Sequence, residues 1–254
     1  MLSIPEEISK AQCVGEPVSF EWDYEISTHY AYDEEIGVRM AKTFDKANYR
    51  TIVTLEVCIF EWFVRRFEGM MDLTDAYHRL EAAYACAINP NYLNADKFED
   101  IELESTETRR PADVLQTGIY RIWKPLKLCY GAQVGLAGDC VNLTLLTHYV
   151  MSDPNRFDKW LEASLRKGAK IFPREVDSYD VEANFYNYGV EKIVPREFFF
   201  DPDFEYSEDA ATTVLQEFLD SLDPKKNPYL QTAKQMKADG YTRTPYKIID
   251  LKMG

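Results

Sequence analysis

The 254 residues carry a formal net charge of −14, a pI near 4.7 and 14% aromatic residues. Nucleic acids and anionic membrane surfaces select basic patches, so this charge argues against both as partners. It is compatible with a basic protein partner, because opposite charges steer encounters over a long range. A chain of this length buries roughly three quarters of its unfolded surface. Because no stretch has the composition of a linker, we expect one helical domain, 1–254.

The N-terminal residues 1–31 are predicted to form an irregular arm. Within this arm, apolar and acidic residues alternate from Val18 to Ile26, which is the two-residue period of a strand with one buried face. No partner strand is evident nearby. The alternative is therefore an extended segment whose aromatic side chains anchor it to helices. We expect at most a minor β element near 18–26.

Three helices joined by short turns are predicted over 33–88, and short turns favour antiparallel neighbours. The second helix, 48–68, is apolar on nearly all sides, which is typical of a helix in a protein core or a membrane. Its four ionisable residues near the middle and the end make a membrane span costly. We therefore predict that 48–68 is the central buried helix of the fold. The third helix should stop before Asn89 and Pro90.

A polar break separates these helices from a predicted helical middle part, 111–168. Three glycines in that part lack the spacing of a phosphate-binding loop. We interpret them as small residues that let two helices approach closely. They are Gly131, Gly135 and Gly138.

The last third, 169–254, is predicted to be looser, with short helices. Residues 193–206 combine prolines with successive aromatic residues, and we expect them to be extended. Ser207 has the position of an N-cap for one helix. Thr232 and Gln235 have the spacing of a capping box for another. Taken together, these elements predict a mainly α, single-domain multi-helix bundle.

The five cysteines are widely spaced, and no C-x-x-C motif occurs. This pattern argues against a disulfide framework and against a zinc site, and it favours reduced thiols in the cytoplasm. Cys58, Cys86 and Cys140 lie among apolar residues, so we expect them in the core. Residues 1–12 lack the basic and apolar regions of a signal peptide. We therefore predict a cytoplasmic protein without a cofactor or metal.

Acidic residues gather in two stretches that we predict to contact a partner. The candidate binding residues are Glu99, Asp100, Glu102, Glu104, Glu107, Asp201 and Asp203. A solvated loop is the plain alternative for the first stretch. The second stretch places acids at positions one, three, five and nine of a calcium-binding loop, but it lacks Gly at position six and Glu at position twelve. We interpret it as an acidic turn before a helix.

Two carboxylates on the central helix are the alternative candidates for a catalytic site. A helical wheel places Glu56 on the apolar face and Glu61 in a narrow polar strip, so we expect Glu56 to be buried and Glu61 to be more exposed. A perturbed carboxylate can serve as a general base. Buried charges must also be paired, and no second catalytic group is visible. A structural role is therefore favoured for Glu56.

These observations favour an acidic, soluble protein that binds a partner with a basic surface. A toxin-neutralising immunity or inhibitor protein is one example of this class. The first alternative is an enzyme with a carboxylate site on the central helix, although no catalytic motif is evident. The second alternative is a structural subunit of a larger assembly. The sequence does not indicate an oligomeric state.

Overall fold

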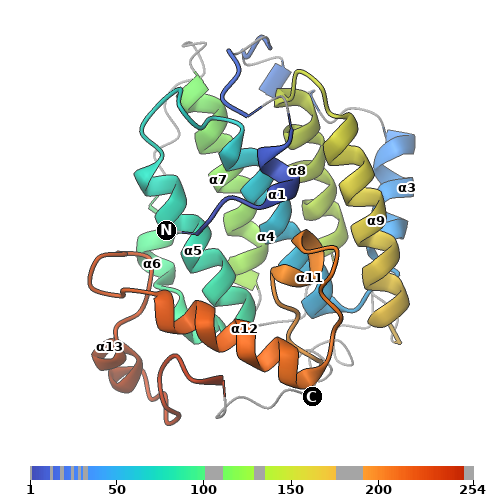
Figure 1. The fold of residues 1–254 in the computed structure, drawn as a ribbon. Coiled ribbons are helices and arrows are strands. Elements are labelled where there is room, and N and C mark those ends of the chain that lie inside the picture. The colour runs from blue at the N-terminus through green and yellow to red at the C-terminus, as the bar shows by residue number, and fades with distance from the viewer. Residues whose placement is uncertain are drawn as a thin grey trace.

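The computed structural model describes residues 2–11, 14–17, 20–23, 26–27, 30, 34–100, 111–128, 135–175 and 191–248. The described residues form helices and no strand, which confirms the predicted mainly α fold. The elements labelled in Figure 1, together with the 3₁₀ turn η1, are α1 (Glu6–Ser9), α3 (Glu34–Phe44), α4 (Tyr49–Arg65), α5 (Thr74–Ile88), η1 (Pro90–Tyr92), α6 (Ala95–Phe98), α7 (Pro111–Leu128), α8 (Leu136–Val150), α9 (Asn155–Ile171), α11 (Glu197–Phe200), α12 (Glu208–Ser221) and α13 (Ala233–Ala238).

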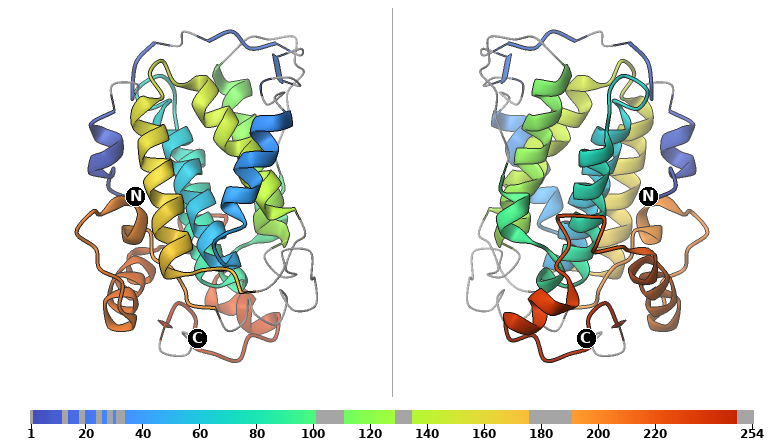
Figure 2. Two further views of the ribbon diagram at one scale, coloured as in Figure 1. Left: turned by 90° about the vertical axis from the view of Figure 1, so that its right-hand side faces the viewer. Right: turned by 90° about the vertical axis from the view of Figure 1, so that its left-hand side faces the viewer.

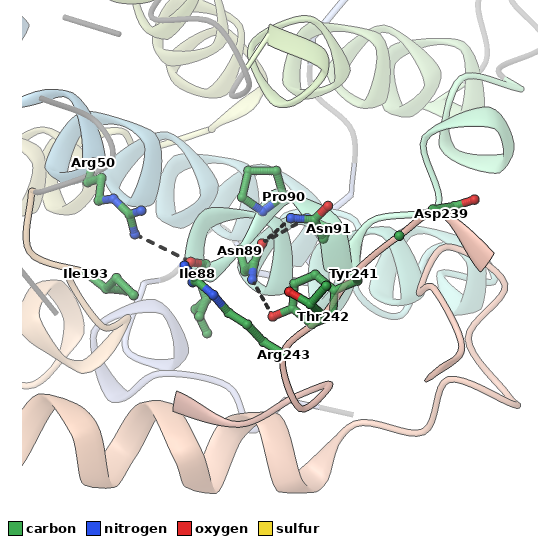
Figure 3. Close-up of a pocket in the computed structure, with 11 residues that line it drawn as sticks. Arg50, Ile88, Asn89, Pro90, Asn91, Ile193, Asp239, Tyr241, Thr242 and Arg243 are labelled. Carbon is green, nitrogen blue, oxygen red and sulfur yellow. Dashed lines mark hydrogen bonds between the residues drawn. The ribbon is translucent and has the colours of Figure 1, made fainter. Parts of the chain in front are cut away.

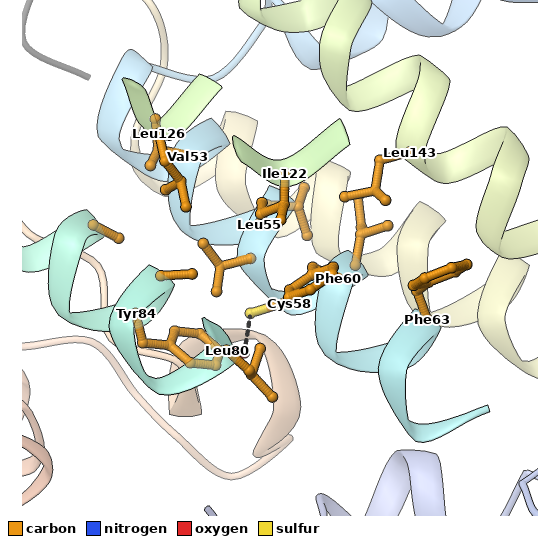
Figure 4. Close-up of a cluster of buried hydrophobic side chains, with 14 of the residues drawn as sticks. Val53, Leu55, Cys58, Phe60, Phe63, Leu80, Tyr84, Ile122, Leu126 and Leu143 are labelled. Atoms are coloured by element: carbon orange, nitrogen blue, oxygen red, sulfur yellow. Dashed lines mark hydrogen bonds between the residues drawn. The ribbon is translucent and has the colours of Figure 1, made fainter. Parts of the chain in front are cut away.

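Helix α4 is the centre of this arrangement, and all of its residues are buried. It begins where the Asn48 side chain accepts a hydrogen bond from Thr51 N at 3.0 Å, which is an N-cap. It packs against α5, α7, α8 and α9. Figure 4 shows side chains of α4 interleaved with those of its neighbours, including Leu80, Ile122 and Leu143. The prediction of a central buried helix is confirmed.

Helices α5, α7, α8 and α9 surround α4, and α12 lies across one end of this bundle (Figures 1 and 2). Helix α3 packs mainly against α8, so the first predicted helix is not the close neighbour of the second. Helix α5 ends at Ile88, as the following Asn89 and Pro90 predict. Among the described residues, no helix is both long enough and apolar enough to cross a membrane.

Close approach of two helices occurs at Gly118 rather than at the predicted glycines. A Cβ on Gly118 would lie 2.0 Å from Phe63 Cε1, so α7 and α4 touch at this position. Gly135 instead precedes α8 with φ +112°, a left-handed conformation that favours glycine. A Cβ on Gly138 would meet nothing within 4 Å. Our interpretation was therefore wrong for these two glycines, and Gly131 lies outside the described residues.

The described residues of the 18–26 stretch do not form a strand. Phe20 and Trp22 instead act as anchors on the helices. The Phe20 ring meets Phe67 edge-on at 6.5 Å between centroids, and the Trp22 ring lies 6.2 Å from that of Tyr149. The alternative of an aromatic-anchored segment therefore describes 20–23 better than the β element, because the described residues offer it no partner strand.

Arg66 fixes the N-terminal arm at the end of α4. Its side chain is completely buried. Nε donates to Val150 O at 2.8 Å, Nη1 to Glu16 O at 2.7 Å and Nη2 to Pro17 O at 3.2 Å. One guanidinium thus joins the arm to the last residue of α8, and these carbonyls satisfy hydrogen-bond donors that would be costly to bury alone.

The segment 193–206 is not extended throughout, because it contains α11. Phe198, Phe199 and Phe200 turn their rings into the protein, and Phe200 stacks on Trp160 with 5.2 Å between ring centroids. Consecutive buried rings favour one helical turn, because an extended chain would point alternate side chains to solvent. The predicted caps are confirmed: Ser207 accepts from Ala210 N, and Thr232 forms a capping box.

Candidate functional site

Glu61 has no exposed surface, which contradicts the expected exposure. Its carboxylate forms a bidentate pair with Arg196, with Oε2 at 2.7 Å from Nε and Oε1 at 2.6 Å from Nη2. The Tyr84 hydroxyl donates to Oε2 at 2.9 Å, and Arg65 Nη2 lies 3.6 Å from Oε1. The prediction failed because the polar strip of α4 faces the chain around Arg196 and not solvent.

The two arginines of this cluster also hold the start of the chain. Arg196 Nη2 donates to Ser3 O at 2.7 Å, and Arg65 Nη2 donates to Leu2 O at 2.7 Å. Burial alone would lower the pKa of Arg196, but the Glu61 carboxylate more than offsets this and raises the pKa above its ordinary value. The Arg196 guanidinium therefore stays charged at every ordinary pH. With its oxygens engaged by these donors, Glu61 is poorly placed to take a substrate proton.

Glu56 is buried, as expected, with 1% of its surface exposed. It lies next to Cys140 of α8. Burial in the first place, and the nearby Glu56 carboxylate in the second, raise the pKa of the Cys140 thiol well above its ordinary value. Burial likewise raises the pKa of Cys58. The two catalytic candidates, Glu56 and Glu61, are thus both enclosed in the core. The predicted core cysteines Cys58, Cys86 and Cys140 are buried free thiols.

Exposed acids gather in the turn 201–209, which we call the acidic loop. This stretch contains five carboxylates and no basic residue. All five are exposed: Asp201, Asp203, Glu205, Glu208 and Asp209. Within the described part of the chain, Glu208 alone has an ion-pair partner, Lys192 at 2.7 Å. The acidic loop therefore presents four carboxylates that form no ion pair within the described residues, although Asp201 lies near enough to Lys167 to attract its charge.

Buried contacts hold the acidic loop in place from beneath. Lys167 of α9 donates to Phe198 O at 2.8 Å and to Phe204 O at 3.2 Å. The Tyr206 ring meets Phe172 edge-on with 4.7 Å between centroids. The backbone and the rings of the loop are thus both fixed, and the Asp201 carboxylate adds to this order by accepting from Asp203 N at 2.9 Å.

The other acidic stretch is described only in part. Glu99 pairs with Lys127 of α7, and Asp100 is exposed while its carbonyl oxygen accepts from Arg79 at 3.0 Å. Glu102, Glu104 and Glu107 lie outside the described residues. The role of this stretch in binding stays a prediction.

A cleft of about 450 Å³ opens between α5, α12 and the segment leading into α11. We call it the α12 cleft. Its apolar wall includes Leu2, Ala87, Val194, Val214, Leu215 and Phe218. Its charged residues are Arg196, Glu197 and Glu217. Sequence reasoning missed this cleft because its walls come from five separate parts of the chain.

Partial burial raises the pKa of Glu197, and the Glu197 backbone N–H and the neighbouring Arg196 only partly offset this effect. Glu217 projects from α12 and is exposed. In the described residues, neither carboxylate has an ion-pair partner. The α12 cleft thus combines an apolar wall with two acids that form no ion pair within the described residues.

A second pocket, of about 350 Å³, lies at the end of α5 (Figure 3). Arg50 and Arg243 line it, and Arg50 Nη1 lies 3.5 Å from Ile88 O. Asn89 Nδ2 donates to the Tyr241 hydroxyl at 3.0 Å. Guanidinium groups at a helix C-terminus offset the partial negative charge of its carbonyls. This pocket therefore has an evident structural purpose.

The described part of the chain holds no group of three or more His, Cys, Asp or Glu side chains that could bind a metal ion. No protein-family model, curated protein or solved structure matches this chain. The molecule is therefore defined by its own geometry: a helical protein with an acidic loop beside a partly charged cleft.

Proposed function

We propose that this protein acts by binding a protein partner with a basic surface, and that the acidic loop is its point of first contact. The observation that carries the proposal is the set of four exposed carboxylates on one fixed turn that form no ion pair within the described residues. Like charges so close together repel one another, and a basic partner relieves that repulsion. Fixing the turn before binding lowers the entropy cost of association.

Exposed charges of this kind act mainly on the rate of association. They steer encounters and select partners, while buried contacts set the lifetime of the complex. A cytoplasmic immunity or inhibitor protein that neutralises a basic toxin is the example we favour. Neither nucleic acid nor a cofactor is part of this proposal.

The alternative of an enzyme has less support. Glu56 is enclosed in the core, and Glu61 is engaged by three hydrogen-bond donors. Both arrangements suit a structural carboxylate better than a general base. No observation specifically favours a structural subunit of a larger assembly.

Charge-neutralised variants test the proposal. The loop variant carries D201N, D203N, E205Q and D209N. The matched control carries E35Q, D96N, E162Q and E175Q, which remove the same charge from exposed sites elsewhere. Affinity capture from the producing cells, followed by mass spectrometry, identifies proteins that the wild type and the control retain. We expect a basic protein that the loop variant retains poorly.

The rate of association with the captured protein then tests the role of the acidic loop. At low salt, the loop variant should associate about tenfold more slowly than the control, and added salt should shrink this difference because it screens exposed charges. Equal association rates for the loop variant and the control would contradict the proposal. So would a captured partner with an acidic surface.

A further inference from the structure

The α12 cleft borders the acidic loop along the chain. Glu197 lies four residues before Asp201, and α12, which supplies Val214, Leu215 and Glu217 to the cleft, begins inside the acidic loop. A partner drawn to the acidic loop is therefore brought to the cleft as well. The charge and the apolar lining of the cleft indicate which chemical group it accepts.

The charge of the cleft is negative. Arg196 is the one cation among its lining residues, and Glu61 already neutralises it through the bidentate pair. Glu197 and Glu217 have no such partner among the described residues. An anionic occupant would face both carboxylates, whereas a cation would be attracted by both.

The wall of the cleft is apolar. Val214, Leu215 and Phe218 come from α12 and Ala87 comes from α5, with the Tyr84 ring edge-on to Phe218 at 6.1 Å between centroids. The volume of about 450 Å³ lies within the range of roughly 300–1,000 Å³ that is usual for ligand pockets. A purely apolar occupant would leave the partly buried Glu197 without a partner, which is unfavourable. The cleft therefore suits an aliphatic chain that ends in a positive charge.

We propose that the α12 cleft receives a lysine or arginine side chain of the basic partner, with the aliphatic stem on the apolar wall and the charged head at Glu197 and Glu217. Such side chains bury their stems while keeping the head at polar groups. This inference rests on the proposed function. The acidic loop speeds association, and the side chain held in the cleft slows dissociation as a central anchor of the interface.

The test uses hexylamine and hexanoate as probes, because they share one apolar chain and differ in the sign of the charge. Methyl NMR signals of Val194, Val214 and Leu215 report occupancy of the cleft. We expect hexylamine to shift these signals saturably and hexanoate to leave them unchanged. The variant E197Q/E217Q should raise the Kd for hexylamine about tenfold, whereas E205Q/D209N, which removes the same charge from the acidic loop, should leave it nearly unchanged.

Binding of hexanoate as strong as that of hexylamine would overturn the inference, and so would an unchanged Kd in E197Q/E217Q. The comparison of the two probes needs the wild-type protein only, so it decides the question even if a variant fails to fold. With the captured partner, E197Q/E217Q should speed dissociation and the loop variant should slow association. If the loop variant has no effect but E197Q/E217Q speeds dissociation, the proposed role of the acidic loop fails and the inference about the cleft stands.

Discussion

Replacing Arg196 by Met tests the buried ion pair most directly. The substitution R196M keeps an aliphatic side chain but removes both hydrogen bonds to Glu61, at 2.7 and 2.6 Å. It leaves a fully buried carboxylate with the Tyr84 hydroxyl and with Arg65 at 3.6 Å. Breaking a buried pair from one side costs about 3–5 kcal/mol. Because Arg65 still compensates part of the charge, we expect a loss of about 3 kcal/mol.

Urea denaturation followed by circular dichroism measures this loss. For a protein of this size, each kcal/mol corresponds to a shift in Tm of about 2–4 °C, so R196M should melt about 6–12 °C lower. The double variant E61Q/R196M removes the stranded charge as well. It should recover most of the loss, since replacing both members of a buried pair is often close to neutral.

Two results would refute this reasoning. A loss below about 1 kcal/mol for R196M would place the pair among exposed ion pairs, against its burial. A double variant no more stable than R196M would show that the stranded Glu61 carboxylate is not the source of the loss.

Three further outcomes are expected from urea denaturation. Glu56→Ala should cost about 1–3 kcal/mol, because it removes the carboxylate beside the buried Cys140 thiol and leaves a gap in the core; no loss of stability would contradict the burial of Glu56. Gly118→Ala should lower the free energy of unfolding by about 1–3 kcal/mol, because the added methyl group clashes with Phe63. Gly138→Ala has open space around the added methyl group and should raise it by about 0.5–1 kcal/mol. Equal effects of the two substitutions would contradict the close contact of α7 with α4 at Gly118. The pKa of Glu197 is raised, so the folded state binds more protons, and the contribution of Glu197 to the free energy of unfolding falls as pH rises from 4.5 through that pKa. The free energy of unfolding of E197Q relative to the wild type should therefore grow over this pH range. A difference that shrinks as pH rises would contradict the raised pKa.

The sequence predicted the features that depend on neighbours along the chain. Helix 48–68 was predictable because its apolar residues run without Gly or Pro, and the caps at Ser207 and Thr232 act within three residues. The environment of Glu61 was not predictable, because its partner Arg196 lies 135 residues further on. A helical wheel assigns a polar face to solvent, and it fails for a helix that is covered on every side.

The same limit applies to the candidate site. Exposure of Asp201 and Asp203 follows from a run of acids between turn residues, and the structure shows both to be exposed. The α12 cleft needs Leu2, Ala87 and Val214 to meet, and nothing in their sequence spacing indicates this. The exposure of the acidic loop could therefore be predicted from the sequence, whereas the α12 cleft beside it depends on the tertiary fold.

The complete burial of α4 has a consequence for synthesis on the ribosome. Residues 49–65 are made well before α7, α8 and α9, three of the helices that cover them. At roughly 5–20 residues per second, the interval from the end of α4 to the end of α8 lasts about 4–17 s. During that time an apolar helix has few partners within its own chain. The ionisable side chains of α4, which are buried in the finished protein, interrupt its apolar sequence and so disfavour association of the nascent helix with other unfinished chains.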